Sequence, residues 1–295
     1  MRKIEFIRTA LFVPGNRPDR IDKAVNTPAD AVIVDLEDAV PPAMKAEARP
    51  AVREKIQALN TPRLLVRVNA LDTEFVQADL DELVVEGLTC IIFPKMEKPE
   101  QVRKANQLLS DAEAQKGIPT GTVSMIALIE SALGIENAFQ IISEQTKPAR
   151  LFTVAFGAAD FTLDMGIEMT KTGEEITFPR ARLAVACRAA GVEPPIDTPF
   201  MIDLKDPEAL EADAKCAKQL GFQGKLCIHP NQVDICNQIF SPTEKDIEQA
   251  HKIVAAFKEA EVAGTGVLQV EGKFIDLPLV KQARRILKIA KTIGR

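Results

Sequence analysis

The chain lacks tryptophan and tyrosine altogether, and its 14 phenylalanines are its only large aromatic side chains. A hydrophobic core must therefore be built from aliphatic side chains and Phe. No apolar run approaches the roughly 18 residues that a membrane-spanning helix requires, and no signal-peptide-like apolar stretch precedes the first candidate strand. We therefore expect no membrane segment. We predict a cytoplasmic protein, or one that reaches an organelle lumen after losing a transit peptide.

The chain also lacks an excess of positive charge. It carries 37 Lys and Arg against 42 Asp and Glu, a formal net charge of −5. General nucleic-acid binding is disfavoured because it needs a basic face. A local basic patch for an anionic small molecule remains compatible with this balance.

Cysteine is scarce, and its arrangement matches neither a disulfide framework nor a metal site. The number of cysteines is odd, and no CxxC spacing occurs. We expect free, buried thiols in a reducing compartment. The five residues are Cys90, Cys187, Cys216, Cys227 and Cys236.

Short apolar runs recur along most of the chain, separated by segments with helical punctuation. Each run is nearly all apolar instead of alternating, as expected for strands covered on both faces. The predicted strands are Ala10–Val13, Ala31–Leu36, Leu64–Val68, Cys90–Phe93, Ser124–Ile129, Leu151–Phe156, Phe200–Leu204 and Lys225–Ile228. The predicted helices between them include segments that start at Asp72, Pro99, Pro179 and Asp206 and stop before Gly87, Gly117, Gly191 and Gly221.

This alternation of strand and helix predicts a parallel sheet. Repeated eight times, it favours a closed (β/α)₈ TIM barrel, for which about 250 residues are typical. An open doubly wound sheet is the main alternative. It is weakened because the first strand–helix turn, Pro14–Pro18, is not GxGxxG.

Polar residues gather where the predicted strands end, which in such barrels is the face that carries the active site. A purely structural barrel has little reason to collect charges there, because buried charges must be paired or bound to metal. These residues are Asp35, Glu37 and Asp38 after strand two, Arg67 and Asn69 at strand three, Lys95 after strand four, Glu130 after strand five, Asp160 after strand six and His229 after strand eight.

Glu130 and Asp160 follow adjacent strands and suit a divalent cation. Mg²⁺ commonly takes one or two protein carboxylates and completes its octahedron with substrate and water. The alternative is that each acid caps the following helix or pairs with Arg67 or Lys95. Spacing alone does not separate these interpretations.

Arg67 interrupts an apolar strand, where it could bind a carboxylate, stabilise an enolate oxygen, or form a structural ion pair with Asp35 or Glu37. Lys95 could form a Schiff base with a keto substrate, but pairing with the nearby carboxylates is favoured. His229 is either a core residue or a hydrogen-bond donor to substrate.

Residues after about position 240 are not needed to close a barrel. Their pattern predicts a helix from Ser241 to about Val262, a short hairpin over 267–276 and a basic final helix from Pro278. We therefore divide the chain into a catalytic barrel, 1–240, and an extension, 241–295, that acts as a lid or an oligomer element. Asp276, beside the hairpin, is either an acid–base group or an ordinary turn residue.

Seven motifs in order along the chain resemble the citrate lyase β-subunit and malyl-CoA lyase family of the HpcH/HpaI-type aldolases. The resemblance covers essentially the whole chain. Each motif is weak alone, but seven in order at the strand ends are specific. They are 11–18 (LFVPGNRP), 35–40 (DLEDAV), 67–69 (RVN), 129–131 (IES), 157–161 (GAADF), 224–230 (GKLCIHP) and 272–276 (GKFID).

This resemblance implies roles that spacing did not. Glu130 and Asp160 would hold Mg²⁺, with Mn²⁺ as an alternative ion, and Glu130 would also border the substrate. Arg67 would bind the substrate carboxyl or thioester region, and Asp276 would be the acid–base group, presented to a neighbouring subunit of a homotrimer or hexamer. Glu37 and Asp38 would orient Arg67 and Lys95 or hold water on the metal. The acyl-CoA site would be lined by Phe12, Val13, Arg17, Lys23, Ile228 and His229.

The implied activity is cleavage or formation of a carbon–carbon bond in a 3-hydroxyacyl-CoA such as malyl-, citramalyl- or citryl-CoA. The products would be acetyl- or propionyl-CoA and an α-keto acid. The alternative is a citrate lyase β-subunit that acts on a citryl acyl-carrier protein within a complex. Ala159 resembles the stand-alone lyases, whereas Glu is usual there in the β-subunits. A non-catalytic module that binds CoA or a carrier protein is disfavoured because the candidate catalytic set is intact.

Overall fold

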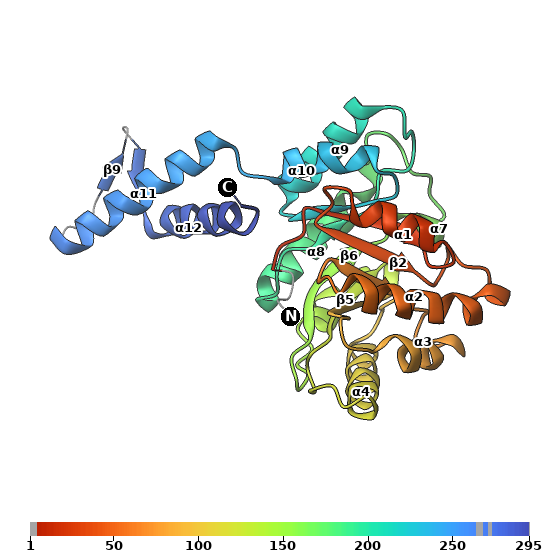
Figure 1. The fold of residues 1–295 in the computed structure, drawn as a ribbon. Coiled ribbons are helices and arrows are strands. Elements are labelled where there is room, and N and C mark those ends of the chain that lie inside the picture. The colour runs from red at the N-terminus through yellow and green to blue at the C-terminus, as the bar shows by residue number, and fades with distance from the viewer. Residues whose placement is uncertain (1–4, 264–267, 271–272, 295) are drawn as a thin grey trace. The chain divides into compact units, whose positions relative to one another are not determined.

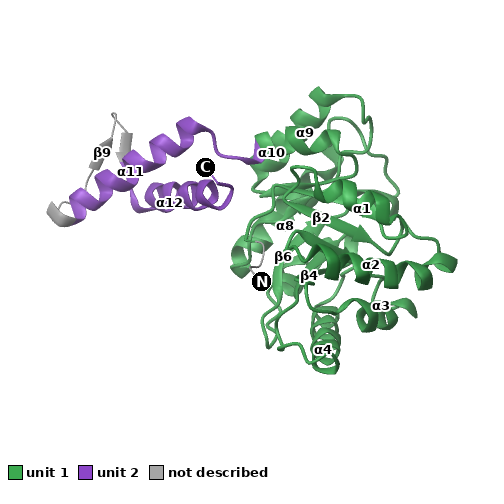
Figure 2. Cartoon of the chain, viewed as in Figure 1, with its two compact units in different colours: residues 1–238 green, residues 239–295 purple. Residues whose placement is uncertain are grey.

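The computed structural model describes residues 5–263, 268–270 and 273–294. The chain divides into two compact units, Met1–Gln238 and Ile239–Arg295, which are coloured separately in Figure 2. Each unit has its own hydrophobic core.

The first unit is a closed barrel of eight parallel strands, so the predicted fold is confirmed (Figure 1). Each strand pairs with the next one along the chain, and β8 returns to β1, where Thr9 lies opposite Lys225. The strands are β1 Thr9–Pro14, β2 Ala31–Asp35, β3 Leu64–Arg67, β4 Cys90–Phe93, β5 Ser124–Ile129, β6 Leu151–Phe156, β7 Ile196–Asp197 and β8 Gly224–Cys227.

Helices follow the strands and begin and end where local chemistry favours it. Pro99 occupies the first turn of α4 (Pro99–Gln115), and the Asp206 carboxylate caps α9 (Pro207–Leu220) by accepting the Ala209 N–H at 3.0 Å. Gly191 ends α8 (Thr177–Ala190) and Gly221 ends α9, with left-handed φ values of 71° and 105°. The helices of this unit are α1 Pro18–Val25, α2 Lys45–Leu59, α3 Phe75–Leu83, α4 Pro99–Gln115, α5 Ala132–Glu136, α6 Ala138–Ile142, α7 Ala158–Met165, α8 Thr177–Ala190, α9 Pro207–Leu220 and α10 Asn231–Phe240, with short 3₁₀ turns η1 Pro42–Met44 and η2 Glu174–Ile176.

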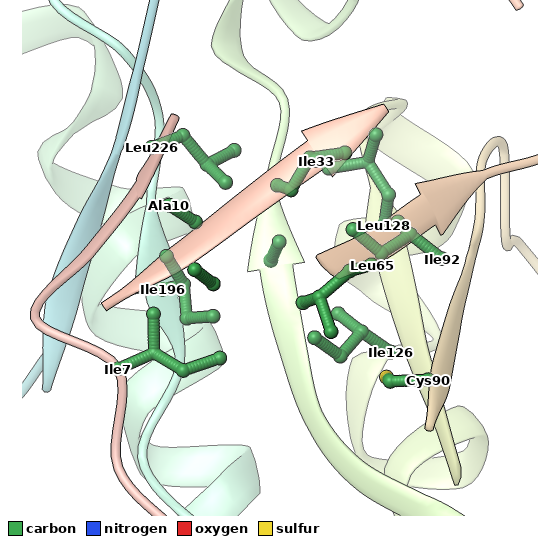
Figure 3. Close-up of a cluster of buried hydrophobic side chains, with 12 residues drawn as sticks. Ile7, Ala10, Ile33, Leu65, Cys90, Ile92, Ile126, Leu128, Ile196 and Leu226 are labelled. Atoms are coloured by element: carbon green, nitrogen blue, oxygen red, sulfur yellow. The ribbon is translucent and has the colours of Figure 1, made fainter. Parts of the chain in front are cut away.

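Aliphatic side chains fill the barrel, as the absence of Trp and Tyr requires. Ile33, Leu65, Ile126 and Leu226 come from four strands and belong to one buried cluster (Figure 3). The outward faces are covered as well, since all five residues of β2 are buried. Burial on both faces explains why the strands are continuous apolar runs.

One predicted strand was wrong. Strand seven was expected at Phe200–Leu204, but β7 is Ile196–Asp197 and the predicted segment is a loop in which Ile202 and Leu204 are exposed. The apolar pattern of the sequence did not reveal β7, because this strand is two residues long, follows two prolines and contains an acidic residue. Asp197 is fully buried and pairs with Arg180 at 2.9 Å and with Lys225 at 2.5 Å.

The second unit has the expected order of helix, hairpin and helix. It comprises α11 Glu244–Ala263, the antiparallel strands β9 Leu268–Val270 and β10 Lys273–Ile275, and α12 Leu277–Thr292. The predicted turn residues Glu271 and Gly272 lie outside the described residues. A small core joins α11 to α12 through Ala250, Ile253, Ile275, Val280 and Ala283.

Neither disulfides nor membrane-type helices constrain the described parts of the chain. All five cysteines are free; four are buried and Cys216 is partly exposed, which confirms the expected thiols. Among the helices of the described residues, none combines the length and apolar character needed to cross a bilayer.

Candidate active site

A cavity of about 890 Å³ opens in the first unit at the C-terminal ends of the barrel strands. Side chains from the ends of β1, β2, β3, β5, β6 and β8 converge there, as parallel barrels dictate. Glu37 contacts residues of this lining without joining it. The predicted site residues in the lining are Phe12, Val13, Arg17, Lys23, Asp38, Arg67, Glu130, Asp160, Ile228 and His229.

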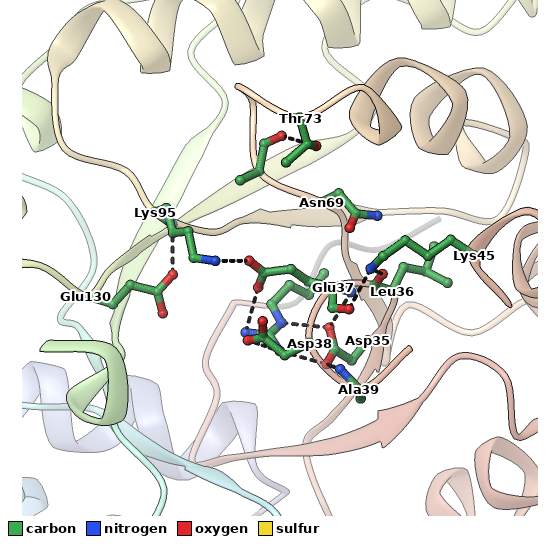
Figure 4. A network of polar contacts seen from close by, with 12 residues as sticks. Asp35, Leu36, Glu37, Asp38, Ala39, Lys45, Asn69, Thr73, Lys95 and Glu130 are labelled. Atoms are coloured by element: carbon green, nitrogen blue, oxygen red, sulfur yellow. Dashed lines mark hydrogen bonds and ion pairs between the residues drawn. The ribbon is translucent and has the colours of Figure 1, made fainter. Parts of the chain in front are cut away.

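Glu130 follows β5 and is only 4% exposed. Its Oε1 accepts the backbone N–H of Lys95 at 2.8 Å (Figure 4). Burial, followed by the nearby negative charges of Asp160 and Glu37, raises its pKa to about 8. In the absence of a cation, this carboxyl is therefore held largely protonated at neutral pH.

Asp160 stands in the first turn of α7, directly after β6. Its side chain makes no hydrogen bond or ion pair within the described residues, and it lines the same cavity as Glu130. Gly157, at the end of β6, permits the close approach of the two strands, because a Cβ there would lie 2.5 Å from Glu130 Oε2. The Thr198 hydroxyl accepts the Ala158 N–H at 3.0 Å and so anchors the start of this helix.

Glu130 and Asp160 together fit a hard divalent cation. Neither acid caps a helix, since Ser131 caps α5 and the N-cap residue of α7 is Gly157, which has no side chain. Neither forms the ion pair with Arg67 or Lys95 that was the alternative interpretation. No cluster of three or more potential ligands occurs among the described residues, so the chain would offer two carboxylates and leave other positions open.

Arg67 is buried and bound on several sides. Its Nε and Nη2 donate to the two Asp35 carboxylate oxygens at 2.7 and 2.6 Å, and Asp38 lies 3.3 Å from Nη2. The guanidinium lies 5.1 Å from the centre of the Phe12 ring. Burial opposes the charge, but the bonds and charge of Asp35 outweigh it and raise the pKa of Arg67. The structural ion pair is thus present, and Arg67 still borders the cavity.

Glu37 joins Arg67 to Lys95. It is 7% exposed, with Oε2 3.0 Å from Arg67 Nη1 and Oε1 2.9 Å from Lys95 Nζ. Both contacts are ion pairs whose angles fall outside hydrogen-bond geometry. Burial is the main cause that raises the pKa of Glu37.

Lys95 pairs with Glu37, which is the interpretation that the sequence favoured. Burial disfavours its charge, but the contact with Glu37 and the charges of Asp38 and Asp160 outweigh burial and raise its pKa. A Schiff-base lysine needs the opposite shift. The backbone of Lys95 has a φ of 54°, a left-handed value that is uncommon outside glycine. This conformation directs the Lys95 N–H to Glu130.

The predicted acyl-CoA residues lie around the ends of the neighbouring strands β1 and β8. Arg17 pairs with Asp19 at 2.9 Å, and Lys23 is exposed in the last turn of α1. His229 is exposed, so it is not a core residue, and its Nδ1 accepts the Asn231 N–H at 3.2 Å. Arg20 and Lys23 of α1 add positive charge to this side of the cavity rim.

Asp276 belongs to the second unit, where it caps α12. Its Oδ1 accepts the Leu279 N–H at 3.0 Å, and the side chain is exposed. The described contacts are those of a helix cap, and the acid–base role stays a prediction.

Sequence reasoning missed Thr198 and the steric role of Gly157. The only signal was their position beside Asp197 and Asp160.

Comparisons with known proteins agree with this geometry. The pattern of the HpcH/HpaI aldolase/citrate lyase family matches residues 8–230. Citrate lyase subunit beta of Leuconostoc mesenteroides subsp. cremoris is 39% identical over 96% of this chain and 93% of its own. L-malyl-CoA/beta-methylmalyl-CoA lyase of Cereibacter sphaeroides is 34% identical over 97% and 95%.

Among solved structures, protein CitE from Mycobacterium tuberculosis in complex with magnesium, acetoacetate and coenzyme A superposes with a TM-score of 0.75. It shares 28% identity and covers 98% of this chain and 99% of its own. The likeness spans the barrel and the extension alike. The chain is therefore a lyase of the HpcH/HpaI aldolase/citrate lyase family.

Proposed function

We propose that this chain catalyses the reversible, Mg²⁺-dependent cleavage of a 3-hydroxyacyl-CoA with a distal carboxylate, such as malyl-, citramalyl-, methylmalyl- or citryl-CoA. The products are acetyl- or propionyl-CoA and an α-keto acid. The observation that carries the proposal is the pair Glu130 and Asp160, which line one cavity with no competing cationic partner among the described residues. Arg67 borders the same cavity.

Glu130 and Asp160 would hold the cation, with Mn²⁺ as an alternative ion. When bound, Mg²⁺ supplies a Lewis acid that polarises the hydroxyl or keto oxygen of the substrate. The buried Glu130 carboxyl would lose its proton on loading, because the positive charge of the cation would offset the burial and the nearby carboxylates that raise its pKa.

Residues of the chain then stabilise the charge that develops as the carbon–carbon bond breaks, and they bind the CoA portion of the substrate. The substrate hydroxyl gives its proton to water in the cavity, the bond between C2 and C3 breaks, and the electron pair passes to the thioester as an enolate. Arg67, held by Asp35, Glu37 and Asp38, stabilises the negative charge on the carboxylate or enolate oxygen. Phe12, Val13, Arg17, Lys23, Ile228 and His229 bind the CoA portion at the rim.

Asp276 is proposed to deliver the proton to the thioester α-carbon, and to remove it in the synthetic direction. We further propose that it acts in a homo-oligomer, a trimer or hexamer, with the extension as the element that brings it to a neighbouring subunit. Its exposed carboxylate is available for such a role.

A second candidate is a citrate lyase β-subunit that acts on a citryl acyl-carrier protein. The 39% identity to such a subunit favours it. Ala159 favours a free CoA ester, because at this position the chain resembles the stand-alone lyases. Since CoA and a carrier protein present similar thioester arms, turnover of free esters by the purified chain separates the two.

The deciding experiment is a coupled cleavage assay of the four CoA esters with and without Mg²⁺. Cleavage of at least one ester is expected, and EDTA should abolish it. Glu130→Ala and Asp160→Ala should each remove Mg²⁺-dependent turnover, with Glu54→Ala, an exposed residue of α2, as the control. Full activity in EDTA would refute the metal assignment. Turnover of only the carrier-bound thioester would select the second candidate.

A further inference from the structure

A buried lysine outside the cavity holds the turn that carries Glu37 and Asp38. Lys45 is the first residue of α2 and is 5% exposed. Its Nζ donates to the carbonyls of Leu36 and Glu37, each at 2.6 Å (Figure 4). Both bonds are charge-assisted, which makes them stronger than bonds between neutral groups.

Burying an ammonium group at this position costs free energy. Burial penalises the charge and lowers the pKa of Lys45, although Asp79, Asp35 and Glu37 oppose the shift. The start of a helix also repels positive charge, because the backbone dipoles are positive there. The cost suggests a role in the neighbouring site.

The turn after β2 is clamped from two sides. The Asp35 carboxylate accepts the N–H groups of Glu37 at 2.9 Å and Ala39 at 3.0 Å. The Lys45 ammonium takes the carbonyls of Leu36 and Glu37 on the other side. The backbone of Glu37 is therefore fixed at both its N–H and its carbonyl. This fixes the point from which its side chain extends to Arg67 and Lys95.

This clamp determines which part of Arg67 faces a ligand. A guanidinium has five N–H groups. Asp35 takes those of Nε and one of Nη2, Asp38 lies beside the second of Nη2, and Glu37 lies beside one of Nη1. By this count one N–H of Nη1 is left for the cavity. If Glu37 moved away, Asp35 would still hold Nε and Nη2, but Nη1 would lose its carboxylate partner. The charge and the N–H groups that Arg67 presents to the substrate would therefore change.

We propose that Lys45 is a positioning residue of the reaction, which fixes the turn bearing Glu37 and Asp38 and thereby aims Arg67 at the keto-acid or enolate end of the substrate. The inference rests on the proposed function, because that function places Arg67 at the reacting end. Lys45 itself does not line the cavity, so its effect must pass through the turn.

The test is Lys45→Met, which keeps most of the side-chain volume and removes the donors. The matched control is Lys55→Met on the same helix, where Lys55 pairs with Asp22 at 2.6 Å away from the cavity. Steady-state turnover of the ester that the wild type cleaves is measured with CoA affinity by calorimetry and with product inhibition by the released keto acid. Urea unfolding reports stability separately.

We expect Lys45→Met to lower kcat by about 10- to 100-fold, the usual effect of losing an orienting contact behind a reacting group. The inhibition constant of the keto acid should rise, while the affinity for CoA stays within about twofold, since the CoA rim lies on other elements. Lys55→Met should match the wild type. A stability loss with unchanged kcat and unchanged keto-acid inhibition would overturn the inference.

If Lys45→Met does not fold, Lys45→Gln takes its place, because its neutral amide can still donate to one carbonyl. It should lose kcat by at least about fivefold, an effect smaller than full loss of the clamp, and turnover equal to wild type would overturn the inference. Failure of the proposed function looks different, since the wild-type chain would then cleave no thioester. If the wild type cleaves a thioester and the Lys45 variant cleaves it equally well, the inference about Lys45 is wrong and the proposed function stands.

Discussion

Replacing Glu130 with glutamine should make the metal-free protein more stable while removing its response to Mg²⁺. The pKa of Glu130 is about 8, against an ordinary value of 4.5. A carboxyl whose pKa is raised by folding binds its proton more tightly in the folded state than in the unfolded state. Its stabilising contribution is therefore present below pH 4.5 and is lost as the pH rises through 8.

The size of this effect follows from the two pKa values. Each pH unit between the two pKa values lowers the free energy of unfolding by about 1.4 kcal/mol. The total loss of stability therefore approaches roughly 5 kcal/mol well above pH 8. Relaxation of the site and entry of water lower this upper bound. Gln keeps the oxygen that accepts the Lys95 N–H at 2.8 Å. In EDTA at pH 8, Glu130→Gln should thus be about 2–4 kcal/mol more stable than wild type, and near pH 5 the difference should largely vanish.

Urea unfolding monitored by circular dichroism between pH 5 and pH 9 measures this difference. Glu54→Gln, an exposed residue on α2, serves as the control. Adding Mg²⁺ at a hundred times its dissociation constant should stabilise the wild type by about 2.7 kcal/mol and leave Glu130→Gln unchanged. The reasoning is refuted if the variant is less stable than the wild type at pH 8 in EDTA, or if the gap between them does not grow with pH.

Three further substitutions test the other groups of the site. Asp276→Asn should fold normally and lose about 10²- to 10⁴-fold in kcat, the range for a lost acid–base group; a near-wild-type rate would remove Asp276 from the mechanism. Gly157→Ala should lose about 10²-fold in Mg²⁺-dependent kcat, because the new Cβ would lie 2.5 Å from Glu130 Oε2, and unchanged kinetics would show that Glu130 need not occupy this place. Lys95→Arg should retain measurable turnover and the wild type should resist borohydride trapping by keto acids, whereas total loss of activity together with trapping would favour a Schiff-base aldolase.

The ion pairs of the site could not be read from local sequence. Arg67 was left between a structural and a substrate-binding role, and the structure gives it Asp35, Glu37 and Asp38 as partners while it still borders the cavity. Lys45 resembles an ordinary charged residue at the start of a helix. Its burial depends on the turn after β2 folding back over it, which no periodicity records.

The order of strands and helices was determined by the sequence alone, because burial on both faces leaves continuous apolar runs and because proline and glycine act on the residues beside them. The same reasoning located Glu130 and Asp160, since carboxyl ends of parallel strands share one face. Only the tertiary structure decided where β7 lies. Asp197 is stable inside the fold because Arg180 and Lys225 reach it from other elements, and charge pairing between distant residues leaves no local pattern.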